Sequence, residues 1–453
     1  MELSTTVGKE KLIALFDAGT FVEVGAFMKR NDELTGVVCG YGAIGGKLVY
    51  AFSQDSDRRK GAIDALQAEK IAMLYGMAMR NEAPVVGFFD SVGAMVGDGA
   101  SVMSAYGKLL RTVSDASGAI LQIAVISGVC AGMAATVASM FDLVITVKER
   151  SALYVNAPFT VGKETGTGDA VMANGLASIE AESDEDAAHR VAKLISLLPS
   201  SSKDMLIADD PNDDINRTVN VDGVKGKELI AEISDLGEFI ELGAGYAPEM
   251  LTGFSVIGGV ACGIVANNAA CNGGVITVDG AKKAAKLIGF CDSFTIPVVT
   301  LVDSVGVEAS AEAENAPLAA QLGKLAMAYA TATTGKITAV VGKAYGASFT
   351  LMGSKALGAD IEYALPVSEI SVMAPASAVA FLWNNRITET TSRADLEKLW
   401  TETEAAPKEA AADGSIDDVI DPAELRQRIC AAVYMLLMKN GGAPERKHCN
   451  LPL

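Results

Sequence analysis

The chain has 453 residues, half of them hydrophobic and 6% aromatic, and its formal net charge is −19. One compact core rarely grows to this length, so we expect two domains of about 200 residues each. The acidic balance argues against nucleic acid as a partner, because phosphate binding needs basic patches. Seven cysteines without C-x-x-C spacing, with two histidines, argue against a zinc site and indicate reduced thiols in a cytosolic protein.

Strand-length apolar runs alternate with helical runs through the first half of the chain. Residues 48–52 and 85–89 are apolar enough for buried strands, and residues 61–81 repeat their apolar side chains at helical spacing. A glycine turn follows the second strand, and another helix comes after it. Such alternation favours α/β units with largely parallel strands.

One uncharged stretch has two interpretations. Residues 116–141 carry no charged side chain and are long enough to cross a membrane. A buried strand ending at 125–128, followed by a buried helix of small residues at 134–138, explains the same stretch. Strands covered on both faces of a parallel sheet are continuously apolar, so we favour this second interpretation.

The chain repeats its own motifs. The pentapeptide D-S-V-G-A at 90–94 returns as D-S-V-G-V at 303–307, 213 residues later. Downstream, the glycines that bracket 128–132 return at 342–346, at an offset of 214. Shared spacing over such a distance indicates two copies of one fold, and therefore two similar pockets.

The copies are joined by a polar segment. Residues 199–216 are rich in Ser, Asp and Pro and are typical of an interdomain linker. We therefore expect an N-terminal domain at 1–212 and a C-terminal domain at 213–453. The repeat ends after about residue 386, where a polar helical extension and a C-terminal helix near 422–439 follow.

The paired glycine turns suggest a chemistry. In each half, one strand runs into Asp-Ser-Val-Gly, and another runs into Gly-x-x-x-Gly and a helix. Backbone N–H groups at a helix N-terminus can stabilise a developing oxyanion. A single motif of this kind would be explained as well by a tight strand-to-helix turn. The occurrence of the motifs in both halves at shared spacing favours an oxyanion-binding site. The sequence has no P-loop and no Ser/His/Asp set, so backbone dipoles would carry the chemistry.

Five segments carry a family resemblance. They are G-V-C-A-G-M at 128–133, K-A-Y-G-A-S at 343–348, P-V-S-E-I-S-V-M at 366–373, I-D-D-V-I-D-P at 416–422 and K-H-C-N-L-P-L at 447–453. Together they resemble the carboxyltransferase subunit of biotin-dependent acyl-CoA carboxylases, transcarboxylases and decarboxylases. The resemblance covers nearly the whole chain and implies an α/β fold of two tandem crotonase-type domains.

The resemblance implies roles for residues of the first half. The N–H groups of Gly132 and Met133 would hold the enolate oxygen of an acyl-CoA thioester. Val92, Gly93 and Ala94 would line the same pocket. No nucleophilic side chain is needed for this chemistry.

The second half would receive carboxybiotin. The N–H groups near Gly346 and Ala347 would hold the ureido oxygen, and Val305 and Gly306 would line the pocket. Thr350 falls where the family varies a residue that helps to select the acyl chain, and its small side chain would admit acetyl or propionyl groups. The sequence has no biotin-acceptor motif, so biotin would arrive on a separate carrier protein.

The family also implies partners and an assembly. Its dimers face the first half of one subunit with the second half of another, and they commonly form hexamers. We expect a biotin carboxyl carrier protein as a partner, with either a biotin carboxylase or membrane decarboxylase subunits. The location would be cytoplasmic, free or peripheral on a membrane complex.

Three turns depart from the family's motifs. Its S-G-G-A-R appears as S-V-G-A-M at 91–95, its D-x-P-G-F as D-S-V-G-V at 303–307, and its F-G-G-S as R-R-K-G at 58–61. The basic triplet either meets CoA phosphates or begins a solvated helix. Three functions remain open: carboxyl transfer to a short acyl-CoA, decarboxylation of a malonyl-type CoA in a sodium-pumping complex, and a non-catalytic scaffold.

Overall fold

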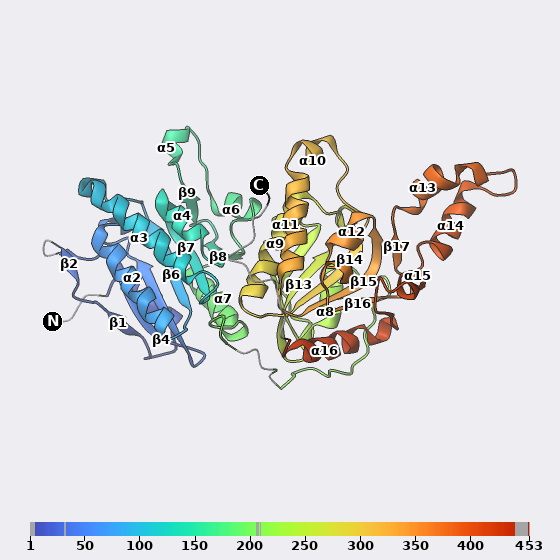
Figure 1. The fold of residues 1–453 in the computed structure, drawn as a ribbon. Coiled ribbons are helices and arrows are strands. Elements are labelled where there is room, and N and C mark those ends of the chain that lie inside the picture. Colours follow the sequence, from blue (N-terminus) through green and yellow to red (C-terminus); the bar gives the residue numbers. More distant parts are fainter. Residues whose placement is uncertain (1–4, 31–32, 205–207, 209, 440–451, 453) are drawn as a thin grey trace. The chain divides into compact units, whose positions relative to one another are not determined.

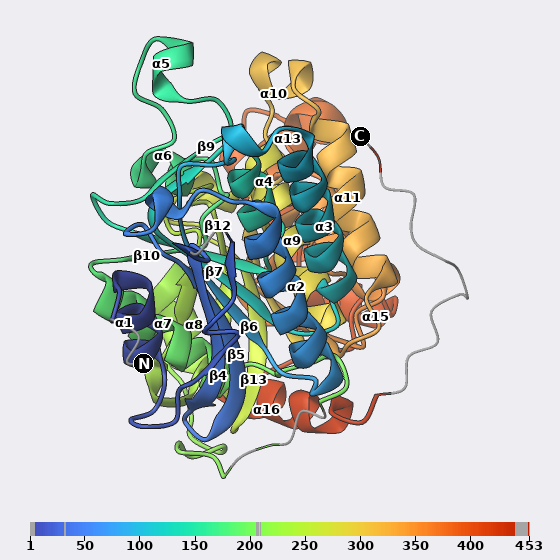
Figure 2. The ribbon, with the colours of Figure 1, turned by 90° about the vertical axis from the view of Figure 1, so that its left-hand side faces the viewer.

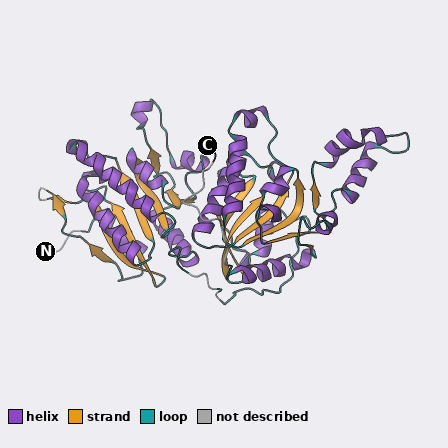
Figure 3. Ribbon diagram, viewed as in Figure 1, coloured by secondary structure: helices purple, strands orange, loops and turns teal. Residues whose placement is uncertain are grey.

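The computed structural model describes residues 5–30, 33–204, 208, 210–439 and 452. The chain divides into two compact units, Met1–Met205 (unit 1) and Leu206–Leu453 (unit 2). Each unit contains an eight-stranded sheet, and each sheet is flanked by helices (Figures 1 and 3). Most of the terminal motif at 447–453 lies outside the described residues.

The sheet of unit 1 has the strand order β1-β4-β5-β6-β7-β8-β10, with β9 paired to β7. The first two pairings are antiparallel and the others are parallel. A small hairpin, β2 (Lys29–Arg30) and β3 (Glu33–Leu34), lies apart from it. The strands of the main sheet are β1 (Val22–Val24), β4 (Val37–Ile44), β5 (Lys47–Gln54), β6 (Val85–Ser91), β7 (Gln122–Ala131), β8 (Leu143–Val147), β9 (Ala152–Tyr154) and β10 (Ile179–Ala181).

Helices cover both faces of this sheet. α2 and α3 lie on one side, and α1 and α7 lie on the other (Figure 2). Buried residues such as Val125 and Ile126 fill the space between sheet and helices. The helices of unit 1 are α1 (Val7–Leu15), α2 (Ala65–Arg80), α3 (Ala100–Ala116), α4 (Met133–Ser139), α5 (Pro158–Val161), α6 (Gly168–Ala173) and α7 (Asp184–Leu197).

Unit 2 repeats the same order of strands, β11-β12-β13-β14-β15-β16-β18, with β17 paired to β15. The pattern of antiparallel and parallel pairing is also the same. The predicted duplication is therefore confirmed. The strands are β11 (Ile240–Leu242), β12 (Met250–Ile257), β13 (Val260–Asn267), β14 (Val298–Ser304), β15 (Lys336–Tyr345), β16 (Ile361–Ala364), β17 (Glu369–Ser371) and β18 (Asp418–Val419).

Helices α9 and α11 pack together in unit 2, with α9 against β12 and β13, whereas α8 and α16 contact each other and β12. The predicted extension after about residue 386 is present as α14 and α15. α14 and the preceding α13 project from the unit in Figure 1. The helices are α8 (Gly226–Ile233), α9 (Val278–Ser293), α10 (Ala311–Asn315), α11 (Leu318–Thr331), α12 (Ala347–Leu351), α13 (Pro375–Ala378), α14 (Arg393–Thr403), α15 (Pro407–Ala412) and α16 (Leu425–Leu436).

The uncharged stretch at 116–141 forms β7 and α4, as its second interpretation predicts. It is apolar because β7 is an interior strand of a sheet covered on both faces. No helix in the described part of the chain combines the length and apolarity needed to cross a bilayer.

The described ends of the predicted linker at 199–216 are each bonded to one of the units. The boundary between the two units falls inside it. Before the boundary, the carbonyl of Ser200 accepts the N–H of Leu121 at 3.0 Å, so this end is part of unit 1. After the boundary, Asp213 accepts two hydrogen bonds from Arg217, and this end belongs to unit 2.

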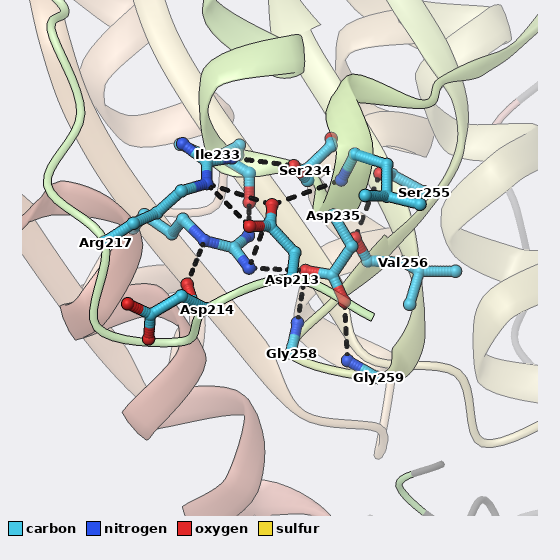
Figure 4. Close-up of polar contacts among 12 residues, drawn as sticks. Asp213, Asp214, Arg217, Ile233, Ser234, Asp235, Ser255, Val256, Gly258 and Gly259 are labelled. Carbon is cyan, nitrogen blue, oxygen red and sulfur yellow. Dashed lines mark hydrogen bonds and ion pairs between the residues drawn. The ribbon is translucent and has the colours of Figure 1, made fainter. Parts of the chain in front are cut away.

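A buried arginine ties the C-terminal helix to unit 2 through an ion pair with Asp235, whose surroundings Figure 4 shows. Arg426 on α16 is fully buried, and its guanidinium donates to Asp235 Oδ1 and to the carbonyl of Ile233, both at 2.6 Å. The same carboxylate accepts the N–H groups of Gly258 and Gly259 at 2.8 Å. One ion pair therefore joins α16, the end of α8 and the β12–β13 turn.

We predict that Arg426→Met lowers the free energy of unfolding of unit 2 by about 3–5 kcal/mol, because Asp235 is then left buried without its counterion. Chemical denaturation followed by intrinsic fluorescence measures this change. Arg428→Met is the matched control on the same helix. Its partner Glu424, at 3.0 Å, is exposed, so the control should lose less than about 1 kcal/mol. Equal losses in the two variants would contradict the prediction.

Candidate active site

The two glycine motifs of each unit meet through a bulge in the sheet. In unit 1, Phe89 pairs with Ile126, but the next paired residue, Ser91, pairs with Cys130. β7 therefore contains two more residues than β6 over this interval, and the surplus residues bend it away from the ladder. In unit 2, the register between β14 and β15 shifts in the same way after Val302.

An aspartate from the neighbouring strand packs against each bulge. A Cβ atom at Gly128 would lie 2.3 Å from Asp90 Oδ1, and one at Gly342 would lie 2.3 Å from Asp303 Oδ1. Glycine is required at both positions because the carboxylate occupies the space that a side chain would need. This contact explains why Asp and Gly recur together in both halves of the sequence.

The two units hold their aspartates with different groups. In unit 2, Asp303 Oδ1 accepts the backbone N–H of Lys343 at 2.9 Å. In unit 1, the buried Lys11 of α1 lies 3.9 Å from Asp90 Oδ2 and donates to Ser127 Oγ at 2.8 Å. Burial lowers the pKa of Lys11, and the carboxylates of Asp184 and Asp90 oppose this shift. The sequence analysis missed Lys11, because no local pattern connects it to a strand more than 100 residues away.

The loop after β6 has the same hydrogen bonds as the loop after β14. Ser91 Oγ accepts the N–H of Gly93 at 3.1 Å, and the carbonyl of Gly93 accepts the N–H of Ile63 at 2.8 Å. Gly93 has φ 104°, a conformation that glycine adopts without strain. Val92 is 48% exposed, and Ala94 follows Gly93 in the same loop.

The corresponding loop of unit 2 contains the predicted Val305 and Gly306. Ser304 Oγ accepts the N–H of Gly306 at 3.2 Å, and the carbonyl of Gly306 accepts the N–H of Ile276 at 2.9 Å. Val305 is 45% exposed. In each unit, the predicted lining residues therefore sit in a rigid loop beside the glycine turn.

Two of the expected donors already have a backbone acceptor in the fold. The N–H of Gly132 donates to the carbonyl of Tyr154 at 2.9 Å, and the N–H of Gly346 donates to the carbonyl of Ser371 at 2.8 Å. Both glycine amides are thus engaged by a neighbouring short strand, β9 or β17. Each glycine serves instead as the N-cap residue of the following helix, at φ 65° or 57°.

The remaining candidate donors are the amides that begin each helix. Met133 is the first residue of α4, and Ala347 is the first residue of α12. N–H groups in the first turn of a helix have no acceptor within the helix, and they point along the positive end of its dipole. The structure thus presents an amide of this kind in each unit, next to the glycine loop.

Unit 2 has a cavity of 560 Å³ at this turn. Three walls enclose it: the start of α12, strand β17, and the α14–α15 extension. Thr350 lines it from the last turn of α12. The lining residues are Gly346, Ala347, Phe349, Thr350, Ile370, Ser371, Val372, Trp400, Glu404, Ala406, Glu409, Ala410, Asp413 and Ser415.

The extension is anchored to the cavity by Trp400. Its Nε1 donates to Ser371 Oγ at 3.0 Å, and its ring meets that of Trp383 edge-on, with centroids 4.8 Å apart. Tyr345, next to Gly346, donates its hydroxyl to Glu369. Burial raises the pKa of Tyr345, and hydrogen bonding to Glu369 raises it further, so the hydroxyl stays protonated. Sequence reasoning missed Trp400, although tryptophan occurs only twice in the chain.

Comparison with known proteins places the chain in a family. The family described as "Carboxyl transferase domain" matches residues 5–451, and the chain belongs to it. The predicted resemblance is therefore confirmed. The chain is 35% identical to the methylmalonyl-CoA carboxyltransferase 12S subunit of Propionibacterium freudenreichii subsp. shermanii, over 98% of this chain and 91% of that protein.

Further relatives have the same coverage. The methylmalonyl-CoA decarboxylase subunit alpha of Propionigenium modestum is 34% identical, over 98% of this chain and 93% of that protein. A crystal structure of the transcarboxylase 12S hexamer, with methylmalonyl-coenzyme A and methylmalonic acid bound, matches with a TM-score of 0.92 at 34% identity. The match covers 98% of this chain and 92% of that one.

We predict that Gly128→Ala lowers the free energy of unfolding of unit 1 by about 1–3 kcal/mol, because the new methyl group displaces the Asp90 carboxylate. The double variant Gly128→Ala/Asp90→Ala should show a coupling energy above about 0.5 kcal/mol, since removal of the carboxylate relieves the clash. Denaturant titration of the four proteins in this cycle measures it.

Gly107→Ala is the control for the substitution itself. Gly107 is exposed on α3, with nothing within 4 Å of the position that a methyl group would take, so alanine should stabilise the protein by about 0.5–1 kcal/mol. If the two substitutions changed the free energy of unfolding additively, the contact between Gly128 and Asp90 would not be what holds the bulge.

Proposed function

We propose that the chain is the carboxyltransferase subunit of a biotin-dependent acyl-CoA carboxylase, and that it moves a carboxyl group between carboxybiotin and a short acyl-CoA. The observation that carries the proposal is the duplicated turn. Each unit ends a bulged strand in a capping glycine and begins a helix at Met133 or Ala347, whose amide has no acceptor within that helix. Two oxyanion-stabilising turns suit a reaction in which negative charge develops on two different ligands.

Unit 1 would bind the acyl-CoA thioester. The N–H of Met133 would donate to the thioester oxygen as it gains negative charge, and the dipole of α4 would add to this stabilisation. Gly132 would orient the amide of Met133 rather than donate to the ligand, because its own N–H is hydrogen-bonded to the carbonyl of Tyr154. Val92, Gly93 and Ala94 would form the wall beside the reacting carbon.

Unit 2 would bind carboxybiotin, which supplies the carboxyl group that is transferred. The residues present fit such a ligand, because a cavity of 560 Å³ is within the range of small-molecule sites. The N–H of Ala347 would donate to the ureido oxygen, and Gly346 would hold that amide in place through Ser371. Val305 and Gly306 would form the loop beside it.

The chain would act within an assembly. Its relative, the transcarboxylase 12S core, is a hexamer, and we propose the same closed assembly of dimers for this chain. Residues 1–212 would be the acyl-CoA domain and residues 213–453 the carboxybiotin domain. A biotin carboxyl carrier protein and a biotin carboxylase would be its partners in the cytoplasm.

The test of the proposed function is direct. The purified chain is incubated with a carboxylated biotin carrier domain and with acetyl-, propionyl- or butyryl-CoA, and the carboxylated product is measured by mass. Transfer to at least one acyl-CoA supports the proposal. Absence of transfer to all three, with a carrier that a known carboxyltransferase accepts, would overturn it.

We predict that Met133→Pro and Ala347→Pro each lower turnover by about 100-fold or more, the loss seen when one oxyanion donor is removed. Proline is tolerated at the first position of a helix, so the substitution removes the N–H with little distortion. Thermal melting checks the fold. Met133→Ala keeps the amide and should retain most of the activity. Near-normal turnover in a well-folded proline variant would refute the donor assignment.

We predict that Thr350→Ile shifts the ratio of rates for acetyl-CoA and propionyl-CoA by about tenfold or more. In the proposed dimer, the cavity that Thr350 lines would face the acyl-CoA site of a second copy, and one methylene-sized change in an apolar pocket discriminates by about 1–3 kcal/mol. Measurement of kcat/KM with each substrate gives the ratio. Thr350→Ser reduces rather than increases the volume and serves as the opposing control. An unchanged ratio in both variants would mean that Thr350 only packs α12.

A further inference from the structure

A strained lysine stands at the turn that precedes α2. Lys60 has φ 54°, in the left-handed region, and Gly61 after it has φ 66°. The matching turn of unit 2 has Gly273 at φ 64° and Gly274 at φ 66°. Unit 2 therefore uses glycine, which adopts this conformation freely, where unit 1 uses lysine, which does not.

Packing does not explain the lysine. Its side chain is exposed, so it fills no space in the core, and a glycine there would relieve the strain. A strained residue persists when the surrounding structure or a function holds it in place. The lysine side chain is the one feature that glycine would not supply.

The repeat shows where this side chain begins. A Cβ atom at Gly273 would lie 3.0 Å from Cγ1 of Val305. Since the two turns have matching dihedrals, the Cβ of Lys60 is directed toward the equivalent residue, Val92. The backbone agrees with this placement, because the carbonyl of Lys60 accepts the N–H of Val92 at 3.2 Å.

The two neighbouring arginines already have acidic partners. Arg59 forms ion pairs with Glu33 and Asp64, and Arg58 lies 3.6 Å from Asp55. Among the residues that the structure describes, no carboxylate lies within ion-pair distance of the Lys60 ammonium group. In a chain of net charge −19, an uncompensated cation beside the predicted pocket is a local attraction for an anion.

We propose that Lys60 binds an anionic group of the acyl-CoA at the mouth of the unit 1 site. The proposal rests on the proposed function, because it takes the wall at Val92 as part of the acyl-CoA pocket. Two anions of that ligand have the right chemistry: the phosphates of CoA, and the carboxylate of the carboxylated acyl group. The strained backbone at Lys60 would then be retained because the lysine supplies a cation, which the glycine at the equivalent position of unit 2 does not.

The test compares ligand affinity in wild type, Lys60→Gly and Lys60→Asn. Calorimetry with acetyl-CoA, with acetyl-dephospho-CoA, which lacks the 3′-phosphate, and with malonyl-CoA distinguishes the two anions. We expect at least one of the three ligands to bind about three- to fivefold more weakly to both variants at low salt, as the loss of an exposed ion pair produces. The difference should shrink as the salt concentration rises.

The pattern across the ligands identifies the anion. A loss with acetyl-CoA that disappears with acetyl-dephospho-CoA assigns the 3′-phosphate. A loss with both acetyl esters assigns the pyrophosphate, and a loss restricted to malonyl-CoA assigns the acyl carboxylate. Equal affinities of wild type and variants for all three ligands would overturn the proposal. If wild type binds none of them, the proposed function itself fails.

Two controls separate binding from folding. Lys60→Asn uses a residue that tolerates left-handed dihedrals, and both variants should melt no lower than wild type. Lys60→Arg keeps the cation and should bind the same ligands as tightly as wild type. Glu149→Gly relieves comparable backbone strain in another exposed turn, where φ is 58°, and it should leave CoA binding unchanged. A loss of affinity in that control equal to the loss in the lysine variants would also contradict the proposal.

Discussion

The contact between an aspartate and a glycine on neighbouring strands is the constraint on which both turns depend. Asp90 packs against Gly128, and Asp303 packs against Gly342. A side chain at either glycine would move the carboxylate, and the bulge beside it would lose its support. Because the bulge sets the direction in which the strand ends, it also sets where the first amide of the following helix points.

The same frame supports two different sites. In unit 1, the aspartate is balanced by a buried lysine from α1, and the turn before α2 carries a strained cation, Lys60. In unit 2, a backbone amide holds the aspartate, and the extension after β17 adds Trp400 to a cavity wall. Duplication preserved the backbone that presents an amide, whereas the surrounding side chains diverged, which agrees with the proposal that the two units bind unlike ligands.

Particular residues show how far sequence reasoning reaches. Repeat spacing predicted the two copies, and the strands at 48–52 and 85–89 were placed correctly, because strand–helix alternation is a local property. The acceptors that the glycine amides have within the fold could not be read from the sequence. Gly132 is bonded to Tyr154, more than 20 residues away, and no local pattern reports that partner. Thr350 lies in the last turn of α12, which has five residues, whereas the corresponding helix of unit 1, α4, has seven.

The sequence by itself determined the duplication, the family, the alternation of strands and helices along the chain and the positions of the glycine turns. These features follow from spacing and from backbone conformations that only certain residues adopt, so they can be read along the chain. The tertiary structure alone decided which amides are free, which cation faces Asp90, and that Arg426 is buried beneath α16. Hydrogen-bond partners and burial arise from residues far apart in the chain, and the energies that select them exist only after packing brings those residues together.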